Sequence, residues 1–248
     1  METQPVKVCV INLDADIERF RRIAQALSPI KGIDVTRVPG VKGKDLPLLA
    51  REVITSHKGW ARERGQIGCF LAHLNAWEIV AAEPGKFCVI FEDDARPIGF
   101  ERILKLYIPV DADLIFINSR MSFSDEDNDP DAHVFCMPFS VAMEKMNTKK
   151  MIGGLDGYIL TPAGAKKLIA AVARDFCYGN VDGRVVRYSI TEERLDAEFS
   201  DTWISEIVKT HHNKDRPPSW GVITSYCVNT PLVGMTFLPS TILAANQD

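Results

Sequence analysis

The sequence lacks the cysteine patterns of zinc-binding and disulfide-rich domains. None of its six cysteines forms a CxxC pair or a Cys/His arrangement with zinc-finger spacing. Cys9, Cys69 and Cys88 lie inside apolar runs, where a thiol usually packs as a small hydrophobic group. We therefore expect free thiols, a reducing compartment and no disulfide framework.

Long apolar runs are also missing. No window approaches the ~20 apolar residues that a transmembrane helix requires. The N-terminal stretch METQPVKVCVINLD has no basic region followed by an apolar segment, so it does not resemble a signal peptide. These absences predict a cytoplasmic protein and leave a peripheral membrane contact open.

An excess of positive charge is absent as well. The 29 basic and 33 acidic residues give a formal net charge of −4, which argues against a nucleic-acid partner, because a phosphate-backbone binder needs a basic face. Hydrophobic residues make up 46% of the chain, enough to exclude disorder as the main state. There is no internal repeat, and we expect a single domain over residues 1–248. The oligomeric state is not indicated.

Hydrophobic periodicity predicts strands that alternate with helices. The expected strands cover residues 6–13, 87–91, 113–118 and 155–160, and the expected helices cover residues 14–27, 67–82 and 162–173. Residues 31–66 are rich in turn formers and are predicted to be mostly loop with short helical pieces. Residues 122–131 (SFSDEDNDPD) are predicted to be a mobile acidic loop that closes over a ligand. This alternation predicts an α/β fold around a mostly parallel sheet.

The strongest local signal is the acidic triplet Glu92, Asp93 and Asp94, which directly follows the apolar run FCVIF. Adjacent carboxylates repel one another, so their position at the end of a buried strand favours a compensating cation. Ligands of open α/β sheets bind beyond the carboxyl ends of the strands, and carboxylates with substrate phosphates commonly hold Mg²⁺ or Mn²⁺. A solvated acidic turn explains the triplet equally well.

The first expected strand also ends in polar residues, in the segment VINLD. Two such strand ends side by side would form a crevice for a nucleotide, in which the backbone of Ile11 and Leu13 contacts the base. Alternatively, Asp14 simply caps the following helix.

Three isolated residues are further candidates. His73 shares a helix face with Phe70 and Trp77, which fits a hydrogen-bonded core histidine as well as a catalytic one. Asp156 and Asp182 lie between apolar segments, and Asp182 is in a glycine-flanked stretch, YGNVDGR, that predicts a turn projecting its carboxylate into a cleft.

Several segments, taken in order, resemble glycosyltransferase family 25. They are VINLD-x4-R (residues 10–19), VPGVKGKDL (38–46), GQIGCFLAH (65–73), VIFEDDA (89–95) and DGYILTPAGAKKLI (156–169). Asp182 falls where the family commonly has an aspartate, and the resemblance covers about residues 6–233. Three features depart from the family pattern: Gln66 replaces the usual Glu, Ala72 replaces Ser, and Asp156-Gly157 precedes Tyr158.

The resemblance implies a Rossmann-like glycosyltransferase A-type (GT-A) fold with a central mixed sheet. It further implies a metal-dependent, inverting transfer of a hexose, with galactose expected, from a UDP-sugar to an acceptor hydroxyl on a lipooligosaccharide or other surface glycan. In this scheme Asp94, with Glu92, holds Mn²⁺ or Mg²⁺. The residues expected on the nucleotide side are Ile11, Asn12, Leu13, Arg19, Glu92 and Asp93.

The acceptor hydroxyl also needs a general base. We expect Asp182 in this role, with Asp156 and His73 as rivals, and His73 as a residue of the acceptor side or of the core. Two other functions stay open: a nucleotide-sugar-binding domain without turnover, and a metal-dependent phosphate-ester hydrolase.

Overall fold

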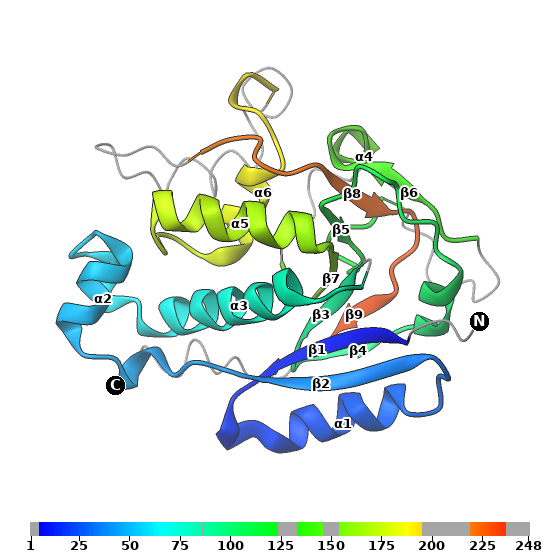
Figure 1. The fold of residues 1–248 in the computed structure, drawn as a ribbon, viewed down its shortest axis with the longest axis horizontal. Helices are drawn as coiled ribbons and strands as arrows, with labels where there is room; N and C mark the ends of the chain where they lie inside the picture. Colours follow the sequence, from blue (N-terminus) through cyan, green and yellow to red (C-terminus); the bar gives the residue numbers. More distant parts are fainter. Residues whose placement is uncertain (1–4, 86, 124–132, 146–153, 195–218, 237–248) are drawn as a thin grey trace.

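The fold is an α/β arrangement around one large sheet (Figure 1). The computed structural model describes residues 5–85, 87–123, 133–145, 154–194 and 219–236. The large sheet has the strand order β2-β1-β3-β7-β5-β8-β6, and β4 pairs with β9 in a small second sheet. The strands are β1 (Val6–Asn12), β2 (Ile33–Pro39), β3 (Cys88–Glu92), β4 (Ala95–Pro97), β5 (Leu114–Phe116), β6 (Cys136–Pro138), β7 (Gly157–Leu160), β8 (Ser225–Val228) and β9 (Val233–Met235).

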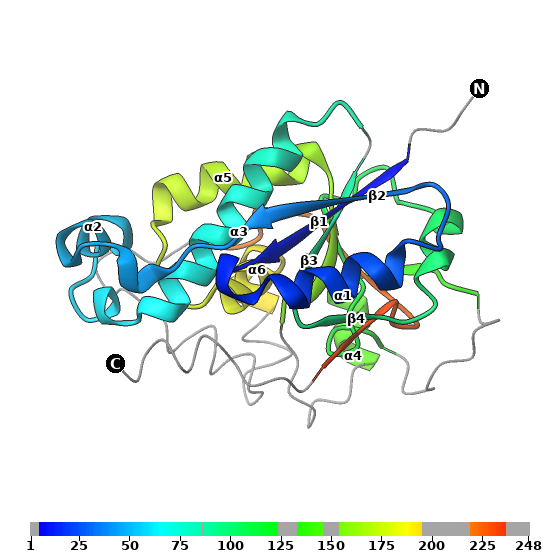
Figure 2. The ribbon, with the colours of Figure 1, turned by 90° about the horizontal axis from the view of Figure 1, so that it is seen from below.

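Helices cover both faces of the large sheet (Figures 1 and 2). The α-helices are α1 (Ile17–Leu27), α2 (Leu48–Thr55), α3 (Arg64–Ala82), α4 (Phe139–Lys145), α5 (Pro162–Asp175) and α6 (Val181–Tyr188). Helices α3 and α5 pack against each other on one face, and α1 lies against β1 and β2 on the other. Within the described residues, no helix is long and apolar enough to cross a membrane.

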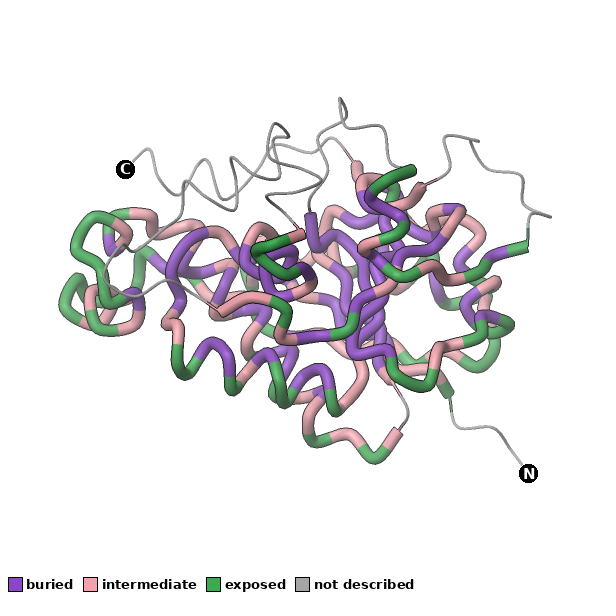
Figure 3. The backbone as a smooth tube through the Cα atoms, turned by 90° about the horizontal axis from the view of Figure 1, so that it is seen from above, coloured by how far each residue is buried: buried purple, intermediate pink, exposed green. Residues whose placement is uncertain are grey.

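Side chains at alternating positions of the central strands pack into two hydrophobic clusters. In β1, Cys9 packs with Phe70 and Trp77 of α3, whereas Val8 and Val10 pack with the cluster under α1. Because both faces are covered, these strands are apolar throughout, as expected for buried strands. The buried strands lie along the middle of the molecule, and the exposed residues gather on outer segments such as α2 (Figure 3).

The expectation of a mostly parallel sheet is wrong. Strand β1 runs parallel to β2 and β3, and β5 runs parallel to β8, but β7 lies antiparallel between β3 and β5. The sheet is therefore mixed, which confirms the central mixed sheet that the family resemblance implied. Because β7 is antiparallel to both β3 and β5, these two strands point in the same direction. They end at the same edge of the sheet, where β7 begins.

The expectation of mostly loop over residues 31–66 is also wrong. This region contains the edge strand β2, the helix α2 and the 3₁₀ turns Gly43–Asp45 and Trp60–Arg62. Strand β2 has only β1 as a neighbour, so its side chains are mostly half-buried or exposed. It therefore lacks the continuous apolar run that identified β1.

The other predicted elements are confirmed with small shifts at their ends. Helix α3 begins three residues earlier than expected, at Arg64. Helix α5 begins as predicted, with Pro162 in its first turn and the Thr161 hydroxyl accepting a hydrogen bond from the Gly164 amide at 3.1 Å. Most of the loop predicted over residues 122–131 lies outside the described residues.

Candidate functional site

The acidic triplet and the VINLD segment meet at the carboxyl ends of two neighbouring parallel strands. Ile11 near the end of β1 lies opposite Glu92, the last residue of β3. A pocket with about 460 Å³ of space, partly open to solvent, lies at these ends. It is lined by Ile11, Asn12, Leu13, Gly40, Val41, Gly68, Cys69, Ala72, His73, Glu92 and Asp93. The structure thus brings together the strand ends that the sequence predicted to form a crevice.

Asp93 is held by two residues of the first βα unit. It accepts hydrogen bonds from Asn12 Nδ2 at 2.7 Å and from Arg19 Nη1 at 3.2 Å. Asn12 is itself buried and accepts a hydrogen bond from Arg37 Nε at 2.9 Å. The side chains of Asn12 and Arg19 are thus engaged with the protein and hold Asp93 at the wall of the pocket.

Glu92, Asp94 and Asp156 form a carboxylate cluster beside this pocket. One oxygen of each lies within 4.8 Å of the others, and the Glu92 amide donates to the Asp156 carbonyl at 3.1 Å. Burial, followed by the neighbouring carboxylates, raises the pKa of Glu92 to about 8 and the pKa of Asp94 to about 7. The cluster therefore holds protons up to near-neutral pH unless a cation replaces them.

The chemistry of this cluster fits a hard divalent cation. Thr236 holds the Asp94 carbonyl through its amide and hydroxyl, whereas Asp94 Oδ1 is buried and has no hydrogen-bond partner within the described part of the chain. A buried oxygen without a partner is costly unless a ligand satisfies it. An all-oxygen donor set suits Mg²⁺ or Mn²⁺.

Cys69, His73 and Glu92 form a second group of donor atoms within the same distance. Both ring nitrogens of His73 are engaged, however: Nδ1 lies 2.9 Å from the Tyr158 hydroxyl and Nε2 lies 3.3 Å from Glu92 Oε1. Burial also raises the pKa of the Cys69 thiol well above its ordinary value, which disfavours the thiolate that metals bind. This group is a poor metal site.

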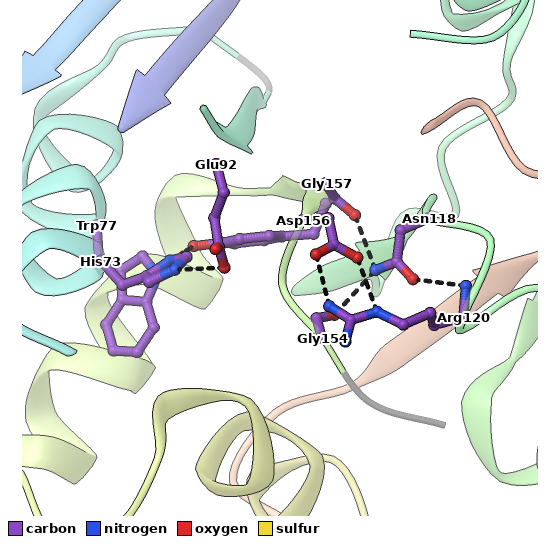
Figure 4. Close-up of polar contacts among 9 residues, drawn as sticks. His73, Trp77, Glu92, Asn118, Arg120, Gly154, Asp156 and Gly157 are labelled. Carbon is purple, nitrogen blue, oxygen red and sulfur yellow. Dashed lines mark hydrogen bonds and ion pairs between the residues drawn. The ribbon is translucent and has the colours of Figure 1, made fainter. Parts of the chain in front are cut away.

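His73 is a fully buried member of a hydrogen-bond chain (Figure 4). Trp77 Nε1, which can only donate, bonds to the Tyr158 hydroxyl oxygen at 2.8 Å. The Tyr158 proton is then directed to Nδ1 of His73, which leaves the ring proton on Nε2, facing Glu92. Burial lowers the pKa of His73 to about 4. His73 is therefore a neutral donor that orients Glu92.

Asp182 does not lie in a turn, as the sequence suggested, but in the first turn of α6. Asn180 caps this helix by accepting a hydrogen bond from the Gly183 amide at 2.8 Å, and this side-chain cap overrides the glycine signal. Asp182 interacts electrostatically with Glu92, Arg120 and His73, and burial raises its pKa to about 7. The helix therefore places Asp182 close enough to Glu92, Arg120 and His73 to interact with their charges.

Arg120 is a site residue that the sequence analysis missed, and Asp156 is one to which it assigned no primary role. Arg120 Nε and Nη2 bond to the two Asp156 oxygens at 2.9 and 2.5 Å (Figure 4). Arg120 follows β5, whose carboxyl end shares the edge with those of β1 and β3. The basic residue shortly after the run DLIFIN was the available signal for Arg120. Whether that residue reaches the site depends on the strand order, however.

Comparisons of the sequence with known proteins find matches to one family. A model of glycosyltransferase family 25, described as an LPS biosynthesis protein family, matches residues 6–181. Procollagen galactosyltransferase 1-A of Xenopus laevis is 28% identical over 181 residues, 66% of this chain and 28% of that protein. A glycosyltransferase 25 family member of Anopheles gambiae is 26% identical over 178 residues, 65% of this chain and 28% of that protein.

A third relative carries a different description. It is named probable inactive glycosyltransferase 25 family member 3, from Bos taurus, and is 31% identical over 122 residues, 46% of this chain and 19% of that protein. The chain thus spans less than a third of the length of these curated relatives. Since the family match covers most of the chain, from β1 to the start of α6, the protein belongs to glycosyltransferase family 25.

Proposed function

We propose that this protein is a UDP-sugar-dependent glycosyltransferase of GT-A type. It would transfer a hexose, with galactose expected, to a hydroxyl of a lipooligosaccharide or other surface glycan, with inversion at the anomeric carbon. The observation that carries the proposal is the pocket at the ends of β1 and β3, which adjoins the cluster of Glu92, Asp94 and Asp156.

Uridine would occupy the pocket, with the backbone of Ile11 and Leu13 facing the base. Gly40 and Gly68 also line the pocket. A Cβ at Gly40 would lie 3.1 Å from the Leu13 amide nitrogen and one at Gly68 would lie 2.3 Å from the Val41 carbonyl oxygen, so these glycines let the walls of the pocket pack closely. Asn12 and Arg19 would act by fixing Asp93 and the end of β1. Glu92 is placed between this pocket and the rest of the cluster, where the diphosphate would lie.

A divalent ion, Mn²⁺ or Mg²⁺, would be held by Asp94 and Glu92, with Asp156 as the third oxygen donor. When bound, it neutralises charge on the departing diphosphate. His73 keeps Glu92 in place through Nε2, since a group behind a metal ligand commonly orients it. His73 is thus proposed as a positioning residue and not as the base.

Asp182 would accept the proton of the acceptor hydroxyl. As that proton leaves, the acceptor oxygen bonds to the anomeric carbon from one face while the bond to the diphosphate oxygen breaks on the other. Asp182 reaches the site from α6, a different element from the β3 end that carries Glu92 and Asp94. A base that enters from another side suits an attack opposite the leaving group.

A transfer assay tests this function. Purified protein would be incubated with UDP-galactose or UDP-glucose, with Mn²⁺ or with EDTA, and UDP release would be followed with and without glycan acceptors. We expect Mn²⁺-dependent UDP release that accelerates with a suitable acceptor. Ester cleavage of simple phosphate esters in place of UDP release would instead favour the hydrolase, which the family membership does not support.

A nucleotide-sugar-binding domain without turnover is the second candidate. It is favoured by the similarity to the Bos taurus relative named as probable inactive and by Ala72, which lines the pocket where the family usually has Ser. Saturable UDP-sugar binding without UDP release, across a panel of glycan acceptors, would support this candidate over the transferase.

A further inference from the structure

Arg120 presents a guanidinium whose orientation is fixed by its neighbours. Nε and Nη2 bond to the two oxygens of Asp156 at 2.9 and 2.5 Å. Such a bidentate pair fixes the plane of the guanidinium. Two of the three nitrogens are thus committed to Asp156, and the direction of the third, Nη1, is determined.

The backbone around Arg120 is built to hold it there (Figure 4). Asn118, fully buried, accepts a hydrogen bond from the Arg120 amide at 3.0 Å and donates to the carbonyls of Gly154 and Gly157 at 2.9 and 3.3 Å. A Cβ at Gly154, whose φ is +131°, would lie 1.7 Å from Arg120 Nη2. Only glycine at this position leaves room for the guanidinium.

The third nitrogen of Arg120 is available to a ligand. Among the described residues Nη1 has no hydrogen-bond partner, and the side chain is 24% exposed. Arg120 also interacts electrostatically with Glu92 and Asp182. It is therefore a cation placed among the carboxylates of the site, and its Nη1 can still donate a hydrogen bond.

The order of groups along the site suggests which ligand accepts a hydrogen bond from Nη1 of Arg120. Figure 4 shows Glu92 between His73 and Asp156, with Arg120 on the far side of Asp156. The pocket proposed for uridine includes His73 and Glu92. A diphosphate that leaves this pocket and passes Glu92 would therefore run toward Arg120.

We propose that Arg120 binds the donor's diphosphate, with Nη1 donating a hydrogen bond to a phosphate oxygen while Asp156 holds the rest of the guanidinium. This inference rests on the proposed function and deepens it by naming a second, protein-borne positive charge on the leaving group. A guanidinium keeps its charge at all relevant pH values and binds phosphate oxygens strongly.

A structural role for Arg120 as the counter-ion of Asp156 makes different predictions. In that role, Arg120→Met would weaken UDP binding only by leaving Asp156 uncompensated. Because Asp156 is also a proposed metal ligand, the double variant Arg120→Met/Asp156→Asn is compared with Asp156→Asn alone, and in the counter-ion role the two should bind UDP equally. If Arg120 contacts the diphosphate, the double variant should bind UDP more weakly than Asp156→Asn, because the guanidinium that bonds to the phosphate is absent.

The test compares UDP with uridine, by calorimetry for UDP and ligand-observed NMR for uridine, at saturating Mn²⁺. The variants are Arg120→Met, Arg120→Lys, Asp156→Asn and the double variant. Arg21→Met, which breaks the exposed Arg21–Glu18 pair of α1, is the matched control for loss of one arginine beside a carboxylate. Thermal unfolding of each variant checks that it is folded.

We expect Arg120→Met to bind UDP about 10- to 100-fold more weakly than the wild type, the range for a hydrogen bond to a charged group, and the double variant to bind it more weakly than Asp156→Asn by a similar factor. Uridine affinity should not change, and Arg120→Lys should fall between the wild type and Arg120→Met. Equal UDP affinity of the double variant and Asp156→Asn, or a loss for uridine as large as that for UDP, would overturn the proposal. A wild-type protein that binds uridine but gains nothing from the diphosphate would overturn it as well, whereas absence of any UDP or uridine binding would remove the proposed function itself.

Discussion

The hydroxyl of Tyr158 lies 2.9 Å from Nδ1 of His73, a residue 85 positions earlier in the chain. This bond joins β7 to α3 and connects the hydrophobic core to Glu92 at the site. The same hydroxyl accepts the indole N–H of Trp77. One buried oxygen therefore sets the orientation of two rings and, through His73, of a proposed metal ligand.

Tyr158→Phe should destabilise the protein. Loss of the hydroxyl leaves Trp77 Nε1 and His73 Nδ1 buried without their partner, and each such group costs about 1–3 kcal/mol. Urea unfolding would measure the change in the free energy of unfolding. Tyr107→Phe is the control, because Tyr107 is 75% exposed and its variant should unfold as the wild type does.

A double-mutant cycle tests the same network. Trp77→Phe removes the indole donor, so Trp77→Phe/Tyr158→Phe should cost less than the sum of the two single changes. Strictly additive free energies would show that Trp77 and Tyr158 do not share this bond in solution.

Asp94→Ala should abolish metal-dependent UDP binding while the fold is kept. Asp94 contributes the buried oxygen that lacks a partner in the described structure, so its loss removes a ligand and little internal bonding. Calorimetry with UDP and Mn²⁺ would measure this. Asp34→Asn, at the exposed amino end of β2, is the control, and unchanged Mn²⁺-dependent UDP affinity in Asp94→Ala would refute the metal assignment.

Asp182→Asn should slow transfer by at least ~100-fold, the lower end of what general-base catalysis supplies. UDP and Mn²⁺ binding should stay near that of the wild type, because Asp182 enters from α6 and lies outside the proposed metal ligands. Single-turnover transfer together with calorimetry would separate the two effects. Transfer at the wild-type rate would refute Asp182 as the base and leave its rivals Asp156 and His73.

The metal-free protein should lose stability as the pH rises from about 5 to about 8. Glu92, Asp94 and Asp182 have native pKa values of about 8, 7 and 7, above their ordinary values of 4.5, 3.8 and 3.8. In this window the native state binds more protons than the unfolded state, so the free energy of unfolding falls with rising pH. Unfolding temperatures in EDTA at several pH values would measure this trend.

Metal should reverse that trend. Since a cation replaces the protons on the cluster, Mn²⁺ should raise the unfolding temperature more at pH 8 than at pH 6. Asp94→Asn should reduce both the pH dependence in EDTA and the gain from Mn²⁺. An Mn²⁺ effect of equal size at both pH values would contradict the coupling between protons and metal.

Gly68→Ala should destabilise the protein and weaken UDP binding, although alanine favours helices. A Cβ at Gly68 would lie 2.3 Å from the Val41 carbonyl oxygen and 2.8 Å from the Gly43 amide nitrogen, and both Gly68 and Val41 line the pocket. Gly85→Ala is the control, because no atom lies within 4 Å of the added carbon. Thermal unfolding would measure the change in stability, and calorimetry would measure the change in UDP affinity. A Gly68→Ala variant more stable than the wild type would show that the loop after β2 moves to admit the added carbon.

The sequence by itself determined the elements with strong local signals. These signals are the apolar runs of β1 and β3, the periodic face of α3 and the Thr161-Pro162 start of α5. Each depends on neighbours within a few residues, so these elements can be predicted directly from the sequence. The acidic triplet was correctly placed at the end of a buried strand for the same reason. The edge strand β2 was missed because a strand with one neighbour carries a weaker apolar pattern.

Only the tertiary structure decided which residues meet at the site. Asp156 joins Glu92 and Asp94 because β7 runs antiparallel to β3, which puts the start of one strand beside the end of the other. Arg120 reaches Asp156, 36 positions away, because β5 ends at the same edge. Strand order and direction are set by long-range packing, and no local pattern encodes them, so the pairing of Arg120 with Asp156 could not be foreseen from the sequence.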